Sequence, residues 1–225
     1  MQANLEHPRH GESLLDFAIH HNRELGLTSR HFSRGSVLFV PHTAINAVFI
    51  IRYGRLRVSA PAESGQQVFL AELGPGDIVG EVSAITGSRE ATIVEAVEDT
   101  EAVVFTRPAF LRVLRECPEG SLQVMRILCE RLKSSNTRHM EKVSLSMAER
   151  LAIEIGRLSS VEDDGVLEVR NAPTHSELAD RIGSHREAVT KELSRLSREG
   201  VLDVQRGLIR VLKPDKLLPN RYSAH

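Results

Sequence analysis

The chain has 225 residues, of which 41% are hydrophobic and 26% are charged, with a formal net charge of −1. These values are typical of a soluble globular protein of one or two domains. No apolar run is long enough to cross a bilayer and the N-terminus lacks a hydrophobic signal segment, so we expect a cytoplasmic protein without a membrane partner. The two cysteines, Cys117 and Cys129, exclude a disulfide framework and cannot supply the four thiolates of a typical iron–sulfur cluster.

The N-terminal part of the chain should contain a polar segment and one short helix. Apolar residues between positions 13 and 25 predict this helix, namely Leu14, Leu15, Phe17 and Ala18. His20 and His21 lie at its end, but adjacent helical side chains point in different directions and no third ligand is in spacing. We therefore expect no metal site there.

Residues 31–105 predict an all-β roll or barrel. Short runs rich in Val, Ile and Phe alternate there with turn signals such as Gly-Pro-Gly-Asp at residues 74–77. After Pro108 the period becomes helical, with a short helix to about Glu116 and a longer helix over residues 119–145. One face of the longer helix carries Leu122, Met125, Leu128 and Leu132. Such a face fits either the edge of a core or the seam of a dimer.

Residues 146–196 predict a helix to residue 158, a strand at 166–169 and then a helix-turn-helix. Thr174 and Glu177 form a capping box that starts its first helix, and Gly183 ends that helix. Ser184 and Glu187 form a second capping box, which starts the next helix. The buried face of this second helix should consist of Ala188, Val189, Leu193 and Leu196.

A wing should follow the second helix. Strands at residues 201–204 and 208–212 flank a turn at 205–207, with Arg206 at its tip. A helix-turn-helix with a wing is typical of DNA-binding proteins, so duplex DNA is the expected partner. Residues 174–213 hold eight Lys or Arg and six Asp or Glu, a balance that permits DNA binding but does not demand it.

The outer face of the second helix should carry the side chains that read bases. We expect Arg186 to bond bidentately to a guanine and Glu187 to accept from a cytosine amine. Thr190 should touch a thymine methyl, and Lys191 should reach a guanine or a phosphate. Glu187 has a rival role as the capping partner of Ser184. A two-fold DNA reader needs a dimer seam, which favours that reading of the longer helix.

A second candidate site lies between residues 73 and 96. Gly76 and Gly80 allow tight turns, and Gly80 with Glu81 should open a short helical segment. Arg89 follows eight residues after Glu81. In a β-roll this spacing places a carboxylate, an arginine and backbone N–H groups in one concavity, which suits a ribose phosphate. The alternative is a buried salt bridge between Glu81 and Arg89 that pins the loop.

A β-roll, a long helix and a winged helix-turn-helix, in that order, resemble the CRP/FNR family of bacterial transcription regulators. The resemblance covers about residues 20–213 and rests on PGDIVGE and REAT in the roll and on ELADRIGSHREAVTKEL in the helix-turn-helix. It implies an α+β fold in three parts. These are a helix and cyclic-nucleotide-binding-like β-roll over residues 1–118, a dimerisation helix over 119–145 and a winged helix-turn-helix domain over 146–225.

The resemblance also implies how the parts act. A homodimer would sense a small effector in its β-roll and place two recognition helices on a pseudo-palindromic operator. RNA polymerase would be a further partner if the protein activates. The implied effector-binding residues are Gly80, Glu81, Arg89, Glu90, Ser135 and Asn136. The implied DNA-binding residues are His175, Ser176, His185, Arg186, Glu187, Thr190, Lys191 and Arg206.

The sequence departs from the family pattern around the effector. Glu90 stands where cyclic-AMP-binding members have a serine beside the phosphate, and a carboxylate there repels an anionic ligand. The loop from Glu81 to Arg89 is also shorter, and residues 41–43 lack the glycine that is usual in the family.

The departures leave the effector open among cyclic AMP, cyclic di-GMP, a haem, gas or redox signal, and no effector at all. Haem would need an axial ligand, for which the candidates are His20, His21, His42 and Cys117. A ligand-binding module whose helix-turn-helix contacts only protein is a rival interpretation, and it predicts no salt-sensitive DNA affinity. An enzyme is not expected, since the sequence lacks the P-loop, G-x-S-x-G and H-E-x-x-H motifs.

Overall fold

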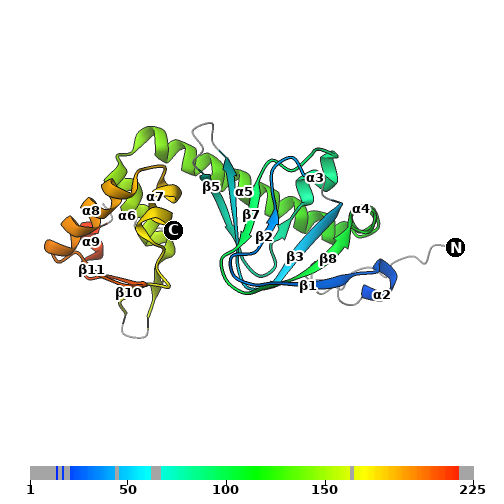
Figure 1. Cartoon of the computed structure of the whole chain (residues 1–225), viewed down its shortest axis with the longest axis horizontal. Helices are drawn as coiled ribbons and strands as arrows, with labels where there is room; N and C mark the ends of the chain where they lie inside the picture. The colour runs from blue at the N-terminus through cyan, green and yellow to red at the C-terminus, as the bar shows by residue number, and fades with distance from the viewer. Residues whose placement is uncertain are drawn as a thin grey trace. The chain divides into compact units, whose positions relative to one another are not determined.

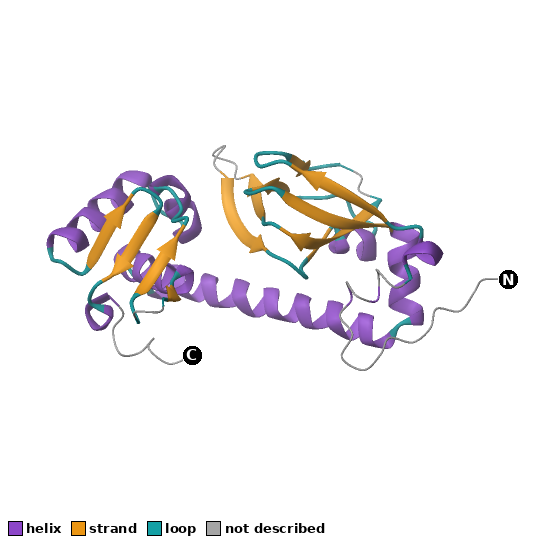
Figure 2. Cartoon of the chain, turned by 90° about the horizontal axis from the view of Figure 1, so that it is seen from below, coloured by secondary structure: helices purple, strands orange, loops and turns teal. Residues whose placement is uncertain are grey.

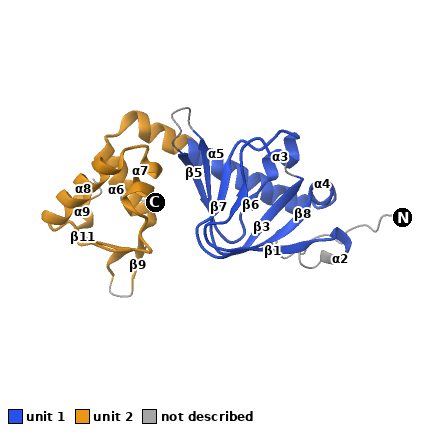
Figure 3. Ribbon diagram, viewed as in Figure 1, with its two compact units in different colours: residues 1–135 blue, residues 136–225 orange. Residues whose placement is uncertain are grey.

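The computed structural model describes residues 14, 17, 21–43, 46–61, 67–162 and 165–217. The chain divides into two compact units, residues 1–135 and residues 136–225 (Figure 3). Within the described part of the chain, none of the helices is both long enough and apolar enough to cross a membrane.

The first unit is the predicted β-roll, built from two four-stranded sheets (Figure 1). One sheet has the order β1-β8-β3-β6 and the other the order β2-β7-β4-β5, and every described pair is antiparallel. The strands are β1 Thr28–Phe32, β2 Val37–Phe39, β3 Ala47–Tyr53, β4 Leu56–Pro61, β5 Gln67–Leu73, β6 Ile78–Val79, β7 Ile93–Ala96 and β8 Thr100–Thr106. The helices are α2 Asn22–Leu25, α3 Glu81–Thr86, α4 Arg107–Glu116 and α5 Pro118–Ser144. The last of these, α5, continues into the second unit.

Two hydrophobic clusters hold the roll together. One draws on both sheets and includes Phe32, Phe39 and Phe49, whose rings meet edge to face. The other joins the roll to its helices through Phe105, Phe110, Val113 and Val124, among others. Leu14 and Phe17, from the predicted N-terminal helix, belong to this second cluster and are buried. Leu15, Ala18 and His20 lie outside the described residues.

The apolar face predicted on the long helix divides between two environments. Val124 is buried, and Ile127 and Leu128 pack against the core of the roll. Leu122, Met125 and Leu132 are 41%, 51% and 62% exposed. The helix therefore uses one apolar strip for its own roll and leaves a second strip uncovered.

The second unit is the predicted winged helix-turn-helix. It contains the helices α6 Met147–Leu158, α7 His175–Ile182, α8 Arg186–Arg198 and α9 Pro214–Leu217. Its strands are β9 Ser160–Val161, β10 Leu167–Arg170, β11 Leu202–Gln205 and β12 Leu208–Val211, and they form one sheet in the order β11-β12-β10-β9. Figure 2 shows strands in orange and helices in purple. One core joins helices to sheet and includes Leu151, Leu178, Val189, Leu193 and Ile209.

The capping predictions for α7 and α8, the two helices of the helix-turn-helix, have different outcomes. Thr174 and Glu177 form the expected capping box, and Gly183 ends α7 in the left-handed conformation with φ of 61°. The second capping box is wrong, because α8 begins one residue later, with His185 at its N-cap and no side-chain cap hydrogen bond. A capping box that was not predicted, Ser146 with Glu149, starts α6.

The difference between the two caps can be tested by mutation. Thr174→Ala should lower the free energy of unfolding by about 1 kcal/mol, because the amide of Glu177 loses its acceptor. Ser184→Ala is the matched control and should change the free energy of unfolding by less than about 0.5 kcal/mol. Urea denaturation followed by circular dichroism measures both. Equal losses would contradict the assignment of the caps.

Candidate effector cavity and nucleic-acid interface

The first unit contains a cavity of about 360 Å³, within the range of small-molecule sites. Most of its wall is apolar and comes from the β4–β5 hairpin, the β6–α3 segment and α5. The apolar lining residues are Val58, Leu70, Ala71, Leu73, Val79, Val82 and Leu128. The remaining lining residues are Gly80, Glu81, Glu90, Thr92, Arg131, Ser134 and Ser135. Four predicted effector residues, Gly80, Glu81, Glu90 and Ser135, therefore line one cavity.

Gly80 shapes the cavity wall where β6 passes into α3. Its φ is 88°, a left-handed conformation that favours glycine, and it is the N-cap of α3. A Cβ at this position would lie 2.6 Å from the carbonyl oxygen of Ala47, which is too close for any side chain. The backbone of β3 and the start of α3 can therefore approach only because this residue is glycine.

Glu81, the first residue of α3, is buried and bonded to a cation on the long helix. Arg131 Nη1 donates to Glu81 Oε1 over 2.7 Å, and Arg131 Nη2 donates to the carbonyl oxygen of Ile78 over 2.5 Å. Asp77 Oδ1 lies 3.6 Å from the same guanidinium. The salt bridge that the sequence suggested for Glu81 thus exists, but with Arg131 and not with Arg89.

Burial raises the pKa of the Glu81 carboxyl above its ordinary value of 4.5. The Arg131 guanidinium acts in the opposite direction and lowers that pKa, while the carboxylates of Glu90 and Asp77 raise it further. The desolvation of this carboxyl therefore outweighs the attraction of its partner.

Glu90 has a different environment, with four hydrogen-bond donors directed at its carboxylate. Oε1 accepts from the backbone N–H groups of Ala91 and Thr92, both over 3.2 Å, and from the Thr92 hydroxyl over 2.5 Å. Oε2 accepts from the Ser83 hydroxyl over 3.0 Å. The Glu90 backbone also exchanges two hydrogen bonds with the turn at His42 and Thr43, where His42 has φ of 67°.

The other predicted effector residues are placed elsewhere. Arg89 is exposed and is not among the residues that line the cavity. Asn136 is exposed and begins the second unit. Arg131 was not predicted, although a signal was available: it lies seven residues, or two helical turns, after Val124 and so shares the face that packs on the roll.

In the second unit, the predicted base-reading side chains form an exposed row on α8. Arg186, Glu187 and Lys191 are all exposed, as is His185 at the N-cap. Val189, Leu193 and Leu196 on the opposite face are buried, whereas Ala188 is only half-buried. The helix therefore presents a polar face to solvent and anchors the other in the core.

A hydrogen bond sets the two helices of the motif against each other. His175 Nδ1 and Thr190 Oγ1 lie 2.8 Å apart, and both residues are half-buried. Ser176, the next residue of α7, is exposed. The Thr190 hydroxyl is thus engaged with His175, while its methyl group takes no part in this bond.

The wing is a two-stranded hairpin. β11 and β12 pair antiparallel, with Gln205 opposite Leu208, so Arg206 and Gly207 form the turn. Gly207 has φ of 75°, and Arg206 is exposed. Arg210 on β12 donates to the buried Glu168 on β10. The wing therefore carries an exposed arginine at its turn.

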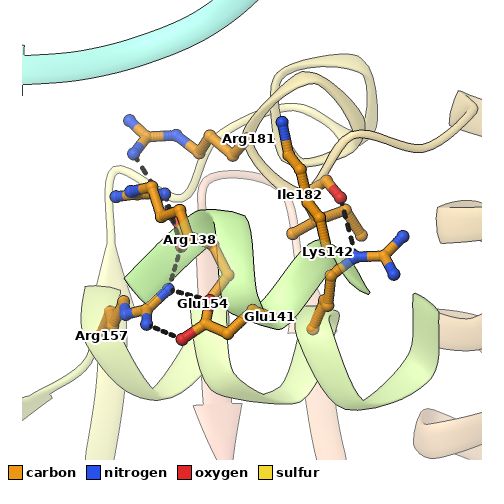
Figure 4. Close-up of a pocket in the computed structure, with 8 residues that line it drawn as sticks. Arg138, Glu141, Lys142, Glu154, Arg157, Arg181 and Ile182 are labelled. Carbon is orange, nitrogen blue, oxygen red and sulfur yellow. Dashed lines mark hydrogen bonds and ion pairs between the residues drawn. The ribbon is translucent and has the colours of Figure 1, made fainter. Parts of the chain in front are cut away.

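An arginine-rich cluster holds α7 in the second unit (Figure 4). The Glu154 carboxylate is 2% exposed, and Arg138, Arg157 and Arg181 contact it at 3.3, 3.5 and 3.4 Å. Arg157 also contacts Glu141. These partners compensate a buried charge that would otherwise be costly, and they connect the end of α5, α6 and α7.

The predicted haem ligands do not share one environment. Cys117 is buried, and its Sγ accepts from the backbone N–H of Gly120. His21 lies against Phe17, and His42 lies on the turn that contacts Glu90. Among the residues that the structure describes, no three His, Cys, Asp or Glu side chains are grouped so as to hold a metal ion.

Comparisons with known proteins agree with this architecture. Residues 29–117 match the family described as cyclic nucleotide-binding domain, and residues 149–219 match the Crp-like helix-turn-helix domain. The cyclic AMP receptor protein of Thermus thermophilus is 30% identical over 184 residues, which cover 81% of this chain and 82% of the relative.

Two solved structures show the same fold. A mutant of CooA from Carboxydothermus hydrogenoformans has a TM-score of 0.75 at 24% identity, covering 92% of this chain and 94% of that one. The c-di-GMP responsive global regulator CLP of Xanthomonas campestris has a TM-score of 0.72 at 18% identity, covering 84% of this chain and 96% of that one.

The raised pKa of Glu81 leads to a pH-dependent prediction. Because the folded-state pKa lies above the unfolded value of 4.5, the carboxyl stabilises the fold below pH 4.5, and this contribution is lost as pH rises through the folded-state pKa. The wild type should therefore lose unfolding free energy relative to Glu81→Gln as pH rises from below 4.5 to neutral. Glu98→Gln, at an exposed carboxylate, is the control and should follow the wild type. Parallel pH profiles for all three proteins would contradict the prediction.

Proposed function

Since the chain belongs to the CRP/FNR family of transcription regulators, we propose that it works as a homodimer on a pseudo-palindromic operator. An effector bound in the β-roll would switch this dimer between states that differ in DNA binding. Family membership makes it an effector-responsive, DNA-binding regulator and not an enzyme. The dimer, the operator symmetry and the residue roles are the proposal. A cytoplasmic location and, for an activator, contact with RNA polymerase belong to it as well.

The observation that carries the proposal is the exposed row Arg186, Glu187 and Lys191 on a helix whose other face is anchored in a core. Arg offers a bidentate fork to guanine, and Glu accepts from the cytosine amine. Because α8 lacks the second capping box, Glu187 is not needed as the partner of Ser184, which supports its role in base reading. Lys191 is a point charge and should discriminate less sharply than an arginine would.

The contacts to the DNA backbone would come from around this row. Ser176 is exposed on α7, His185 is the exposed N-cap of α8, and Arg206 stands at the turn of the wing. His175 is half-buried and bonded to Thr190, so we assign it a positioning role beside any contact to a phosphate. Contacts of this kind fix register without carrying sequence information.

The uncovered strip on α5 supports a dimer. At 100° per residue, Leu122, Met125, Cys129 and Leu132 lie within an arc of about 80°. All four are exposed, and Met140 and Val143 further along the helix are exposed too. Apolar residues at spacings of three and four are the pattern of a coiled-coil seam. We assign the helix over residues 119–145 to dimerisation on this basis.

The effector would act through the cavity. The helix α5 forms part of the cavity wall through Leu128, Arg131, Ser134 and Ser135. A ligand in the cavity would therefore contact the helix that carries the seam. A shift of this helix would move the recognition helices toward a spacing of one DNA turn, about 34 Å. The ligand must bind that state better than the other, or it shifts nothing. The name of the Thermus relative makes cyclic AMP the first effector to test.

The base-reading role predicts a sequence-dependent loss. Arg186→Ala should cost about 1–3 kcal/mol on a duplex enriched from a randomised pool and little on a scrambled duplex. Arg198→Ala removes an exposed arginine from the far end of the same helix and serves as the control. Fluorescence anisotropy measures the affinities of the wild type and both variants for both duplexes. Equal losses for Arg186→Ala on both duplexes would contradict base reading. Salt-insensitive affinity, or none, would favour a protein-contacting module.

The seam predicts a disulfide-linked dimer. In a parallel pair of α5 helices the two Cys129 thiols face each other, so mild oxidation should yield a species of twice 25.0 kDa on a non-reducing gel. Cys129→Ser should abolish this species, while Cys117→Ser should not, because Cys117 is buried in the roll. Leu132→Glu should convert the protein to a monomer in sedimentation velocity. A cross-link that survives Cys129→Ser, or a dimer that survives Leu132→Glu, would place the interface elsewhere.

A further inference from the structure

The charges around the cavity do not suit an anion. Glu81 and Glu90 are two carboxylates in its wall, and Arg131 is the one cationic side chain among its described lining residues. Two nitrogens of the Arg131 guanidinium are already bonded, Nη1 to Glu81 and Nη2 to the carbonyl oxygen of Ile78, while its Nε is buried without a hydrogen-bond partner. Arg89, the arginine expected to hold a phosphate, does not line the cavity. An anionic ligand would therefore meet net negative charge in a partly desolvated space.

The hydrogen-bond donors that an anion would need are present, but they already hold one. Two successive backbone N–H groups, from Ala91 and Thr92, converge on one point together with the hydroxyls of Thr92 and Ser83. Converging donors of this kind form a typical anion-binding nest. The Glu90 carboxylate fills the nest, and hydrogen bonds to an ionised acceptor are among the stronger ones in proteins.

The Glu90 backbone is fixed as well. Its N–H donates to the carbonyl oxygen of Thr43, and its carbonyl oxygen accepts from the N–H of His42. If the Glu90 side chain left the nest, its carboxylate would lose hydrogen bonds from four donors while the main chain stayed anchored. An incoming anion would have to offset that loss. The residues present do not fit a cyclic nucleotide, whose phosphodiester carries a negative charge.

We propose that Glu90 is a built-in anion that occupies the phosphate-type nest of this cavity, and that the effector is an uncharged, mostly apolar small molecule. The apolar wall of seven aliphatic side chains supplies most of the contact area for such a ligand. The carboxylates of Glu81 and Glu90 keep acceptor capacity beyond the bonds described, which favours a ligand with one hydroxyl or N–H donor. This inference rests on the proposed function only in taking the cavity as the effector site.

Two fluorescent probes with the same skeleton test the inference on the full-length protein. N-phenyl-naphthylamine is neutral and carries one N–H group, whereas anilinonaphthalene sulfonate adds a negative charge. The wild type should bind the neutral probe at least about tenfold more tightly than the sulfonate, and it should not bind cyclic AMP. Ala71→Phe fills the cavity and should abolish binding of the neutral probe. This loss would show that the fluorescence of the wild type comes from probe bound in the cavity.

Glu90→Ala empties the nest and should weaken the preference for the neutral probe over the sulfonate. The variant should narrow the gap between the probes by about tenfold and gain measurable affinity for cyclic AMP. Glu90→Gln keeps the shape of the side chain and removes its charge. Its preference for the neutral probe should lie between those of the wild type and Glu90→Ala. Glu98→Ala removes an exposed carboxylate from the same unit and should behave as the wild type.

Three results would overturn the inference. They are binding of the sulfonate by the wild type as tightly as the neutral probe or more tightly, binding of cyclic AMP by the wild type, and failure of the neutral probe to bind at the cavity. None of these readouts involves DNA, so they separate the ligand class from the proposed function. A wild type that prefers the sulfonate and still enriches an operator fails only this inference.

Discussion

Burying the Glu81 carboxyl costs free energy, and the first unit is arranged so that Arg131 offsets part of that cost. The partner comes from α5 and also holds the carbonyl oxygen of Ile78, so one guanidinium connects the β6–α3 segment to the long helix. Gly80 allows this segment to approach the backbone of β3 closely. The wall of the cavity and the helix that carries the exposed apolar strip therefore form one hydrogen-bonded structure. In the proposed mechanism, a ligand that disturbs Glu81 would act directly on that helix.

The second unit solves a similar problem in a similar way. Glu154 is buried and surrounded by arginines from the end of α5, from α6 and from α7. Arg150 adds bonds to the carbonyl oxygens of Ile182 and Leu145, which fix the end of α7 and the start of α6. These contacts fix α7 against α6, and the His175–Thr190 bond connects α7 to α8, whose outer face is exposed. Precise placement of that face on a rigid scaffold is what base reading demands.

Much of this could be predicted because it depends on local patterns. Alternating Val, Ile and Phe predicted the roll, and the capping box at Thr174 with Gly183 predicted α7. Helical spacing could have placed Arg131 on the face of α5 that packs on the roll, but its pairing with Glu81, fifty residues away, depends on tertiary packing and burial. The second capping box failed because Ser184 lies one residue too early, and α8 starts without a side-chain cap. Leu128 was grouped with the exposed strip because its helical position lies beside that strip, and only tertiary packing separates the two environments.

The central claim is that two copies of α8 read one operator, and the symmetry of selected DNA tests it most directly. Purified protein would be incubated with a randomised duplex pool, with no ligand, with cyclic AMP and with the neutral probe, and the retained DNA would be sequenced. The account predicts enrichment of inverted repeats with G·C pairs in each half-site and half-site centres about 34 Å apart. Enrichment of single half-sites or direct repeats would contradict the two-fold dimer. No enrichment in any of the three conditions would contradict the account of DNA reading itself.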